Sequence, residues 1–133
     1  MYRRHFIRSV LSAAALAATA QAAQAAEPTI LVVGDSLSAE YGIARGTGWV
    51  ALLEKKLAAE KIAAKVVNAS ISGDTTAGGR SRLPALLKTH QPGVVVIELG
   101  SNDALRGLSL DATQANLAAM TQAAQKAGAQ VLL

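Results

Sequence analysis

The sequence predicts an α/β domain of three layers, in which helices cover both faces of one parallel β-sheet. Three observations predict this fold: short apolar runs that stop at a glycine or polar residue, longer segments with apolar residues at helical spacing, and their regular alternation. Strands that alternate with helices pair in parallel, because each helix carries the chain back to the starting edge of the sheet. The expected element order is β-α-β-α-β-α-β, for which the usual crossover handedness leaves few topologies.

The first half of the predicted domain contains two strands and a helix. Residues 30–33 are the apolar run Ile-Leu-Val-Val, which ends at Gly34 as expected of a strand buried on both faces. Thr47 is a candidate N-cap for a helix over residues 47–62, and residues 65–68 are the second strand. The predicted buried stripe of this helix comprises Trp49, Leu52, Leu53 and Leu57.

A second helix and a third strand follow. Residues 75–88 have helical character, but Gly78 and Gly79 weaken the helix and Pro84 is expected to start a fresh turn. Residues 94–99 form the clearest strand of the chain, because they are almost entirely β-branched and apolar.

One more helix and a short strand bring the chain to its last residue. Asp111 is a candidate N-cap for the helix, and Gly128 is its expected end. Residues 130–133 form the fourth strand, which would present an apolar edge with nothing after it to cover it. We therefore expect a fold that is truncated after strand four. The predicted core positions of this helix are Leu117, Met120 and Ala124.

The first 25 residues have the pattern of a cleavable export signal. Arg3, Arg4 and Arg8 precede an Ala-rich apolar stretch, and residues 23–25 (Ala-Gln-Ala) offer a cleavage site. The paired arginines also fit the twin-arginine route, while an N-terminal amphipathic helix or anchor is the alternative interpretation. The stretch is too short for a stable membrane span. We expect a signal peptide over residues 1–25, a domain over 26–133, and a periplasmic or secreted protein.

Charge and cysteine content argue against a nucleic-acid-binding protein and against a disulfide-stabilised fold. The formal charge of the 133 residues is +4, but three of the 13 basic residues and none of the nine acidic ones precede residue 26. The domain therefore has a formal charge of +1 and no basic cluster, so no nucleic-acid partner is expected. The chain has no cysteine, so no disulfide framework is expected either.

Three polar loops follow the first three predicted strands. They are residues 34–38 (Gly-Asp-Ser-Leu-Ser), 68–74 (Asn-Ala-Ser-Ile-Ser-Gly-Asp) and 100–103 (Gly-Ser-Asn-Asp). Ligands of open parallel sheets bind beyond the carboxyl ends of the strands, so all three loops belong to one functional edge.

These loops contain the parts of a serine hydrolase. Ser36 follows a tight turn and can present its hydroxyl as a nucleophile. The backbone N–H groups of Ser36 and Gly73 and the side-chain amide of Asn102 can stabilise the oxyanion formed by its attack. Taken singly, each motif is also compatible with an ordinary turn. Asp35 and Asp103 could in principle bind a metal, but no histidine or further carboxylate pattern accompanies them, so no metal site is expected.

The same residues resemble the GDSL (SGNH) hydrolase family. Residues 34–38 match its first block, Gly73 its second, and residues 100–103 its G-x-N-D block. The segments 68–75, 82–88 and 105–107 are most similar to the thioesterase I / lysophospholipase / arylesterase branch. The resemblance runs from about residue 30 to the chain end. It implies a flavodoxin-like sheet of strand order 2-1-3-4(-5), Ser36 as nucleophile, an oxyanion hole of Ser36, Gly73 and Asn102, export, and no cofactor.

The sequence departs from the family at its far end. The family's Asp-x-x-His block, which supplies the general base and its orienting carboxylate, has no counterpart here. His90 lies just before the third strand, about 20 Å from the rim of Ser36 by the length of a six-residue strand, and is interpreted as a loop histidine.

Three functions remain open from the sequence. The first is a serine esterase that hydrolyses a small or lipid-like ester or thioester through an acyl-enzyme. The second is a flavodoxin-like module that binds FMN or phosphate, although Tyr41 and Trp49 are the only aromatic residues after residue 25. The third is a truncated, non-catalytic fragment. The sequence fixes neither the acyl chain length, nor the leaving group, nor the oligomeric state.

Overall fold

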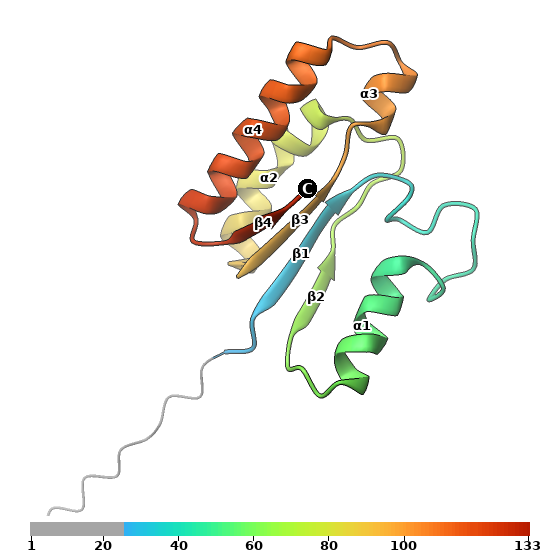
Figure 1. Ribbon diagram of the computed structural model, residues 1–133, viewed down its shortest axis with the longest axis vertical. Helices are drawn as coiled ribbons and strands as arrows, with labels where there is room; N and C mark the ends of the chain where they lie inside the picture. The colour runs from blue at the N-terminus through green and yellow to red at the C-terminus, as the bar shows by residue number, and fades with distance from the viewer. Residues whose placement is uncertain (1–25) are drawn as a thin grey trace, which may run out of the picture.

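The computed structural model describes residues 26–133 as four strands and four helices (Figure 1). The predicted signal peptide of residues 1–25 lies outside the described residues. Within residues 26–133, every helix is too short or too polar to cross a bilayer. The elements are β1 (Thr29–Gly34), α1 (Trp49–Ala59), β2 (Lys65–Asn68), α2 (Thr76–His90), β3 (Val94–Glu98), α3 (Ser101–Leu105), α4 (Leu110–Lys126) and β4 (Gln130–Leu132).

All four strands pair in parallel, in the order β2-β1-β3-β4. This order is the one that the family resemblance implies, so the predicted fold is confirmed. The register pairs Val32 of β1 with Asn68 of β2, and Gly34 with Glu98 of β3. The carboxyl ends of β1 and β3 are therefore level and β2 ends two residues earlier, so the loops that follow all three strands start at one edge of the sheet.

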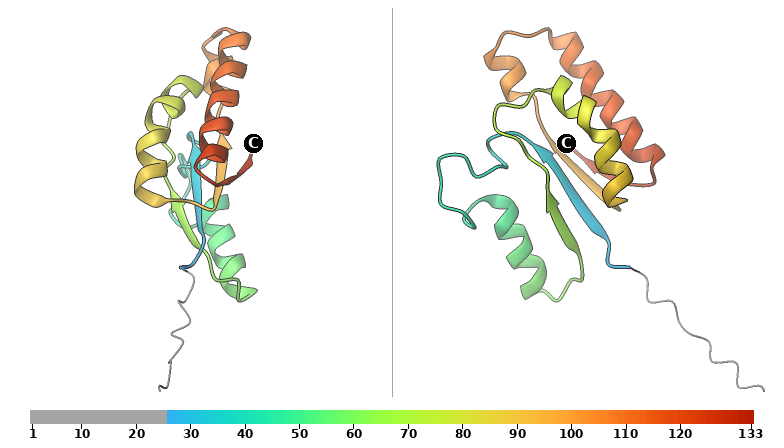
Figure 2. Two further views of the ribbon diagram at one scale, coloured as in Figure 1. Left: turned by 90° about the vertical axis from the view of Figure 1, so that its left-hand side faces the viewer. Right: turned by 180° about the vertical axis from the view of Figure 1, so that it is seen from behind.

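The sheet separates two layers of helices. In the side view of Figure 2, α1 and α2 lie on opposite sides of β1, while α4 packs against α2. The main core lies under α2 and α4, where alternate residues of the central strands point. The buried members of this core are Leu31, Val33, Leu83, Val95, Ile97, Met120, Ala124 and Ala129.

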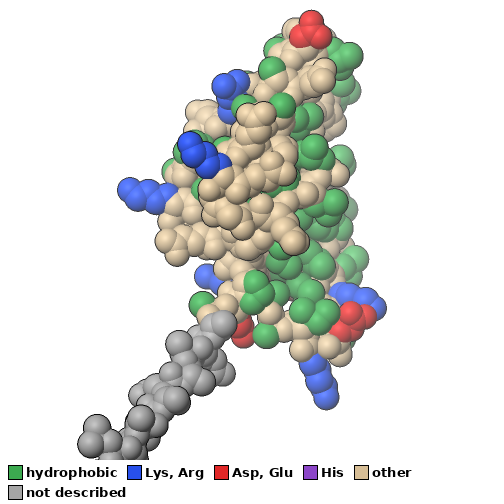
Figure 3. Space-filling model, turned by 60° about the vertical axis from the view of Figure 1, so that its left-hand side comes forward, with side chains coloured by type: hydrophobic (Ala, Val, Ile, Leu, Met, Phe, Trp, Pro, Cys, Tyr) green, Lys and Arg blue, Asp and Glu red, His purple; other side chains and the backbone are tan. Residues whose placement is uncertain are grey.

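The opposite face of the sheet is less covered. Val50 of α1 is buried there, but Leu132 and Leu133 at the end of β4 are 60% and 69% exposed. Figure 3, which brings the α4 side forward, shows apolar side chains in a band along one side of the view. Apolar side chains at β4 are therefore exposed within residues 26–133.

The second helix differs from its prediction, because α2 is continuous through Gly78, Gly79 and Pro84. A Cβ at Gly78 would collide with Asp74, and one at Gly79 would collide with Leu99, so both glycines allow close packing. Pro84 is exposed, whereas Leu83 beside it is 1% exposed and belongs to the core. Tertiary packing therefore outweighs the local cost of these residues.

The first helix is also shorter than predicted. It begins at Trp49 with Gly48 as N-cap, so the assignment of Thr47 as N-cap is wrong. Its stripe is shifted as well: Val50 is buried, but Trp49 is 37% and Leu52 is 55% exposed. The reason is that Glu40 accepts hydrogen bonds from the N–H groups of Gly46 and Gly48, which holds this segment in a loop.

The region after β3 contains a helix that the sequence did not predict. Residues 100–103, interpreted as a turn, begin the short helix α3. The N-cap of α4 is Ser109 rather than Asp111, because Ser109 Oγ accepts a hydrogen bond from the N–H of Ala112 at 3.3 Å. These differences shift boundaries by a few residues and leave the order of strands unchanged.

Candidate active site

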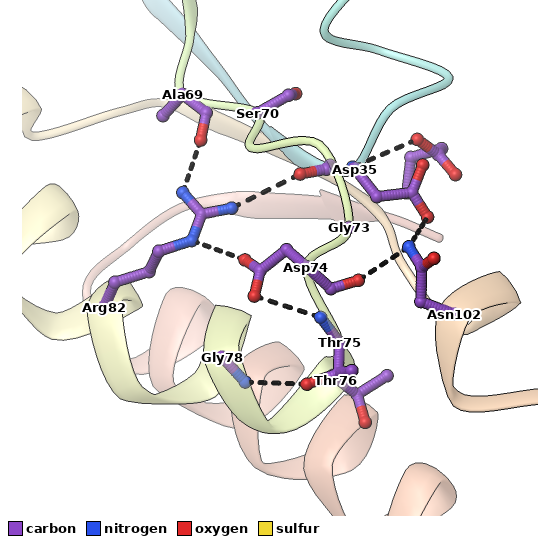
Figure 4. Close-up of polar contacts among 12 residues, drawn as sticks. Asp35, Ala69, Ser70, Gly73, Asp74, Thr75, Thr76, Gly78, Arg82 and Asn102 are labelled. Carbon is purple, nitrogen blue, oxygen red and sulfur yellow. Dashed lines mark hydrogen bonds and ion pairs between the residues drawn. The ribbon is translucent and has the colours of Figure 1, made fainter. Parts of the chain in front are cut away.

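The three predicted loops meet at the carboxyl edge of the sheet. The N–H of Ile71 donates to the carbonyl of Gly34 at 3.0 Å, which brings the second loop against the first. The side-chain amide of Asn102 donates to Asp35 Oδ2 at 3.1 Å and to the carbonyl of Asp74 at 2.9 Å (Figure 4). Asn102 therefore contacts the chain neighbours of both Ser36 and Gly73, and the three loops converge as predicted.

Two backbone N–H groups at this edge are free. In the first turn, the N–H of Leu37 donates to Asp35 Oδ1 at 3.0 Å, and that of Ser38 donates to the Asp35 carbonyl at 3.2 Å. By contrast, within residues 26–133 no acceptor is found for the N–H of Ser36 or of Gly73. Both residues are partly exposed, so these N–H groups are accessible from solvent and available to a ligand that supplies an acceptor.

The backbone conformation at position 73 explains why a glycine stands there. Its φ is +81°, a left-handed value that favours glycine over residues with a Cβ. This bend lets Gly73 turn the chain from the second loop into Asp74, which is hydrogen-bonded back to the Ile71 carbonyl at 3.1 Å. The sequence argument for Gly73, that backbone approaches closely there, is consistent with this geometry.

Asp35 organises the nucleophile turn, defined here as residues 34–38. Its side chain is completely buried and accepts three hydrogen bonds, from the N–H of Leu37, Ser101 Oγ and Asn102 Nδ2. A buried carboxylate is tolerated only when its oxygens are satisfied in this way. Asp35 thus connects the turn that carries Ser36 to the loop that carries Asn102.

An arginine that the sequence analysis did not assign joins the first two loops. Arg82 of α2 forms a salt bridge with Asp74, with Nε 2.8 Å from Oδ2. Its other guanidinium nitrogens donate to the carbonyls of Ala69 and of Gly34 (Figure 4). Arg82 belongs to the segment 82–88 that resembles the family, but only the fold brings it to the ends of β1 and β2.

Glu98 is a second residue that the sequence analysis missed. It is the last residue of β3, and its Oε2 accepts a hydrogen bond from Ser38 Oγ at 2.8 Å. Burial raises the pKa of Glu98; the hydrogen bond from Ser38 opposes this rise, and the charge of Asp35 adds to it. The apolar strand pattern gave no reason to single out this position.

Asp103 makes no hydrogen bond to the loops that carry Ser36 and Gly73, although it follows Asn102 directly. Its carboxylate, 3% exposed, accepts hydrogen bonds from the N–H and hydroxyl of Thr76 and from the hydroxyl of Thr113. Burial alone would raise the pKa of Asp103, but these hydrogen bonds outweigh it and leave the pKa below its usual value. Within residues 26–133 no three His, Cys, Asp or Glu side chains gather as a metal site would need.

His90 is far from this edge. It is the last residue of the 15-residue helix α2, whose first residue Thr76 lies at the carboxyl edge. A helix of that length spans about 22 Å, so His90 is at the opposite end of the sheet from Ser36. The sequence prediction that His90 is not the partner of Ser36 agrees with this placement.

The chain is similar to a family of hydrolases. Residues 32–133 match the GDSL-like lipase/acylhydrolase family. The chain is 55% identical over 127 residues to esterase TesA of Pseudomonas aeruginosa, an alignment that covers 96% of this chain and 63% of that protein. It is 49% identical over 109 residues to thioesterase 1/protease 1/lysophospholipase L1 of Escherichia coli K12, covering 82% of this chain and 51% of the relative.

The fold is shared with solved structures. The crystal structure of TesA superposes with a TM-score of 0.78 and 60% sequence identity, over 79% of this chain and 58% of that one. The chain therefore spans about half to two thirds of the length of the relatives that it matches.

Proposed function

The chain belongs to the GDSL-like lipase/acylhydrolase family, and on that premise we propose that it contributes the nucleophile and oxyanion hole of a serine esterase. Its substrates are carboxylic esters or thioesters with a small or lipid-like acyl group. The observation that carries the proposal is the pair of free N–H groups at Ser36 and Gly73 beside the amide of Asn102. Three donors aimed at one position are what a carbonyl oxygen requires when it becomes negatively charged.

The reaction proceeds through an acyl-enzyme. Ser36 Oγ attacks the carbonyl carbon, and the negative charge that develops on the carbonyl oxygen is stabilised by the N–H groups of Ser36 and Gly73. The alcohol or thiol then leaves with a proton, and water attacks the acyl-enzyme to release the acid and restore the hydroxyl. The proton of Ser36 needs an acceptor, and residues 26–133 place no histidine at this position.

Asn102 must change partners to join this reaction. Its amide nitrogen carries two hydrogens and has two acceptors, Asp35 Oδ2 and the Asp74 carbonyl. A substrate oxyanion is a stronger acceptor than the neutral carbonyl of Asp74, so it can replace that carbonyl while the carboxylate of Asp35 keeps the side chain in place. Asn102 then contributes to the transition state more than to the ground state, which is the condition for a gain in kcat.

The test is hydrolysis of short p-nitrophenyl esters by the protein and by Ser36→Ala, each with and without added imidazole. Imidazole can replace a missing base, and Ser36→Ala in the same buffer measures the background reaction of imidazole itself. We expect a Ser36-dependent rate that added imidazole increases, and no such increase beyond the background reaction in Ser36→Ala. Equal rates of the two proteins under both conditions would exclude Ser36 as the nucleophile.

The flavin-binding alternative has less support. The relatives' names describe hydrolases, and Tyr41, one of the two aromatic residues of the described chain, is 76% exposed. An absorbance scan of the purified protein distinguishes the two functions, because a bound flavin absorbs in the visible region.

We also propose that the protein is exported, with cleavage after Ala25. The support is the sequence pattern of residues 1–25, namely a basic start, an Ala-rich apolar stretch and an Ala-x-Ala site. N-terminal sequencing of the protein recovered from a periplasmic fraction tests this, and blocking the twin-arginine route separates the two export pathways. Recovery of an uncleaved chain from the cytoplasm alone would contradict the proposal.

A further inference from the structure

We propose that Glu98 is a positioning residue for the nucleophile turn, which it fixes through Ser38 and Trp49. The inference rests on the proposed function for its catalytic consequence, but its structural part can be measured without any turnover. It concerns a residue that does not touch the reacting atoms and acts on Ser36 through the turn that carries it.

The first support is the register of the sheet. Glu98 is paired with Gly34 across β3 and β1, so its side chain lies beside the start of the nucleophile turn. Its Oε2 accepts a hydrogen bond from Ser38 Oγ at 2.8 Å and a longer one from the N–H of Asp35 at 3.4 Å. One carboxylate oxygen therefore holds residues on both sides of Ser36.

Trp49 extends this connection to α1. The indole Nε1 donates to Ser38 Oγ at 3.0 Å, while the same hydroxyl donates to Glu98. Trp49 is the first residue of α1, and Ser38 is 1% exposed. A hydrogen-bonded chain thus runs from the first residue of α1 through the turn to the last residue of β3.

The close packing around the hydrogen bonds from Trp49 through Ser38 to Glu98 explains why a glycine, Gly34, opens the turn. A Cβ added at Gly34 would lie 2.7 Å from Ser38 Oγ and 3.0 Å from Glu98 Oε2. Contacts this short force neighbouring atoms to shift, so a side chain at position 34 and the Ser38–Glu98 hydrogen bond are incompatible. The turn is built around this hydrogen bond as much as around Asp35.

The charge of Glu98 matters because both of its partners are donors. An ionised carboxylate accepts from the Ser38 hydroxyl and the Asp35 N–H together, whereas a protonated one carries a hydrogen that competes with them. The ionisable side chain that faces it is Asp35, whose charge and the burial of the site both raise the pKa of Glu98. The turn is therefore held most firmly when Glu98 is ionised. As the pH falls, Glu98 is protonated and the turn loosens at a higher pH than an ordinary glutamate would require, because the pKa of Glu98 is raised.

The structural test uses the single tryptophan of the chain as a reporter. Tryptophan fluorescence and the indole N–H resonance of Trp49 are followed from pH 4 to 8 in the wild type, Glu98→Gln and Glu54→Gln. Glu54 is the matched control, since it is an exposed glutamate on α1, the helix that Trp49 begins. We expect a transition with a midpoint above about 4.3 in the wild type and in Glu54→Gln, and none in Glu98→Gln.

The same titration reports on the nucleophile turn. The backbone amide resonances of Asp35 and Ser36 are expected to shift with the Trp49 midpoint and to become insensitive to pH in Glu98→Gln. The inference is overturned if the Trp49 transition survives in Glu98→Gln, or if the amides of Asp35 and Ser36 do not move with it. Glu98→Gln keeps the size of the side chain, and Ser38→Ala, which removes the link itself, is a second way to abolish the Trp49 transition.

The catalytic consequence is measured by separating kcat from KM. Displacing a nucleophile by about 1 Å can cost up to about 10²-fold in rate, so we expect Glu98→Gln to lower kcat about tenfold with KM unchanged. The acid limb of the kcat profile should also lose its dependence on Glu98. Wild-type kcat in Glu98→Gln at every pH would contradict the positioning role. If the wild type shows no Ser36-dependent turnover, the proposed function fails, while the Trp49 and amide titrations still decide this inference.

Discussion

Two buried aspartates at the same edge of the sheet have different surroundings. Asp35 is completely buried and Asp103 is 3% exposed, and each accepts three or more hydrogen bonds. The partners of Asp35 come from its own turn, which carries Ser36, and from the first two residues of α3. The partners of Asp103 are Thr76 at the start of α2 and Thr113 at the start of α4, so they join helices.

The chemistry of the partners differs as well. Asp35 accepts from Asn102 Nδ2, a group that can only donate. Asp103 accepts from two hydroxyls, which can rotate and accept instead, and Thr113 Oγ1 has a second acceptor in the Ser109 carbonyl at 3.1 Å. Each cluster therefore combines an N–H donor with a hydroxyl, but only the Asp35 cluster contains a side-chain amide of the proposed oxyanion hole. We infer that the first cluster serves the reaction and the second serves stability.

Among the residues of these two clusters and their partners, the largest expected effect is that of Asn102→Ala. Removing one oxyanion donor typically lowers kcat by about 10² to 10³-fold, and we expect a loss in this range with KM changed far less. Steady-state kinetics on a p-nitrophenyl ester measure both constants. An unchanged kcat would exclude Asn102 from the oxyanion hole and would leave it only the structural task of joining Asp35 to Asp74.

Asp103→Ala should have the largest effect on stability. It leaves the N–H and hydroxyl of Thr76 without their carboxylate in a buried place, and each unsatisfied buried group costs about 1–3 kcal/mol. We expect the free energy of unfolding to fall by about 2–4 kcal/mol in urea titrations. Asp103→Asn should cost much less, because its amide can donate to the two threonine hydroxyls. Equal losses in the two variants would contradict the distinction drawn between the clusters.

The sequence predicted the fold better than it predicted these clusters. The strand over residues 65–68 has the predicted bounds, because β-branched runs and polar ends are local signals. The continuity of α2 through Gly78 and Pro84 was not predictable, since it depends on packing against distant parts of the chain. Ser36, Gly73 and Asn102 were singled out because each stands in a polar loop after a strand.

The supporting residues escaped prediction for a related reason. Glu98 looks like the polar end of an apolar strand, and Arg82 looks like one exposed arginine of a helix. Their partners are 60 and 8 to 48 positions away in the sequence, and only the parallel register brings them together. Motifs identify the groups that react, whereas the groups that hold them are defined by tertiary contacts.

Asp35→Asn is expected to lower kcat less than Asn102→Ala does, and it tests whether Asp35 orients Asn102. The new amide can keep its oxygen toward the N–H of Leu37, but its NH2 group then faces the NH2 group of Asn102. We expect Asn102 to be displaced and kcat to fall about tenfold, as for a misplacement of less than 1 Å. The expected change in unfolding free energy is smaller than that of Asp103→Ala. A variant with wild-type kcat would show that Asp35 does not orient Asn102.

The smallest expected effect is a difference in acid sensitivity between the wild type and Asp103→Asn. The pKa of Asp103 is lowered in the folded protein, so its carboxylate contributes stability above the unfolded pKa of about 3.9 that is lost as pH falls through the folded value. Urea midpoints at pH 5.5 and 3.5 should therefore fall more in the wild type than in Asp103→Asn.

Glu98 acts in the opposite sense, because its raised pKa favours the folded protein in acid and this contribution is lost as pH rises. Its contribution is present in both proteins and cancels in the comparison, so the remaining difference belongs to Asp103. Parallel pH dependence in the two proteins would mean that the threonine hydroxyls do not stabilise the ionised form of Asp103. The cluster between α2 and α4 would then owe its stability to packing alone, and the contrast with Asp35 would rest on position rather than on charge.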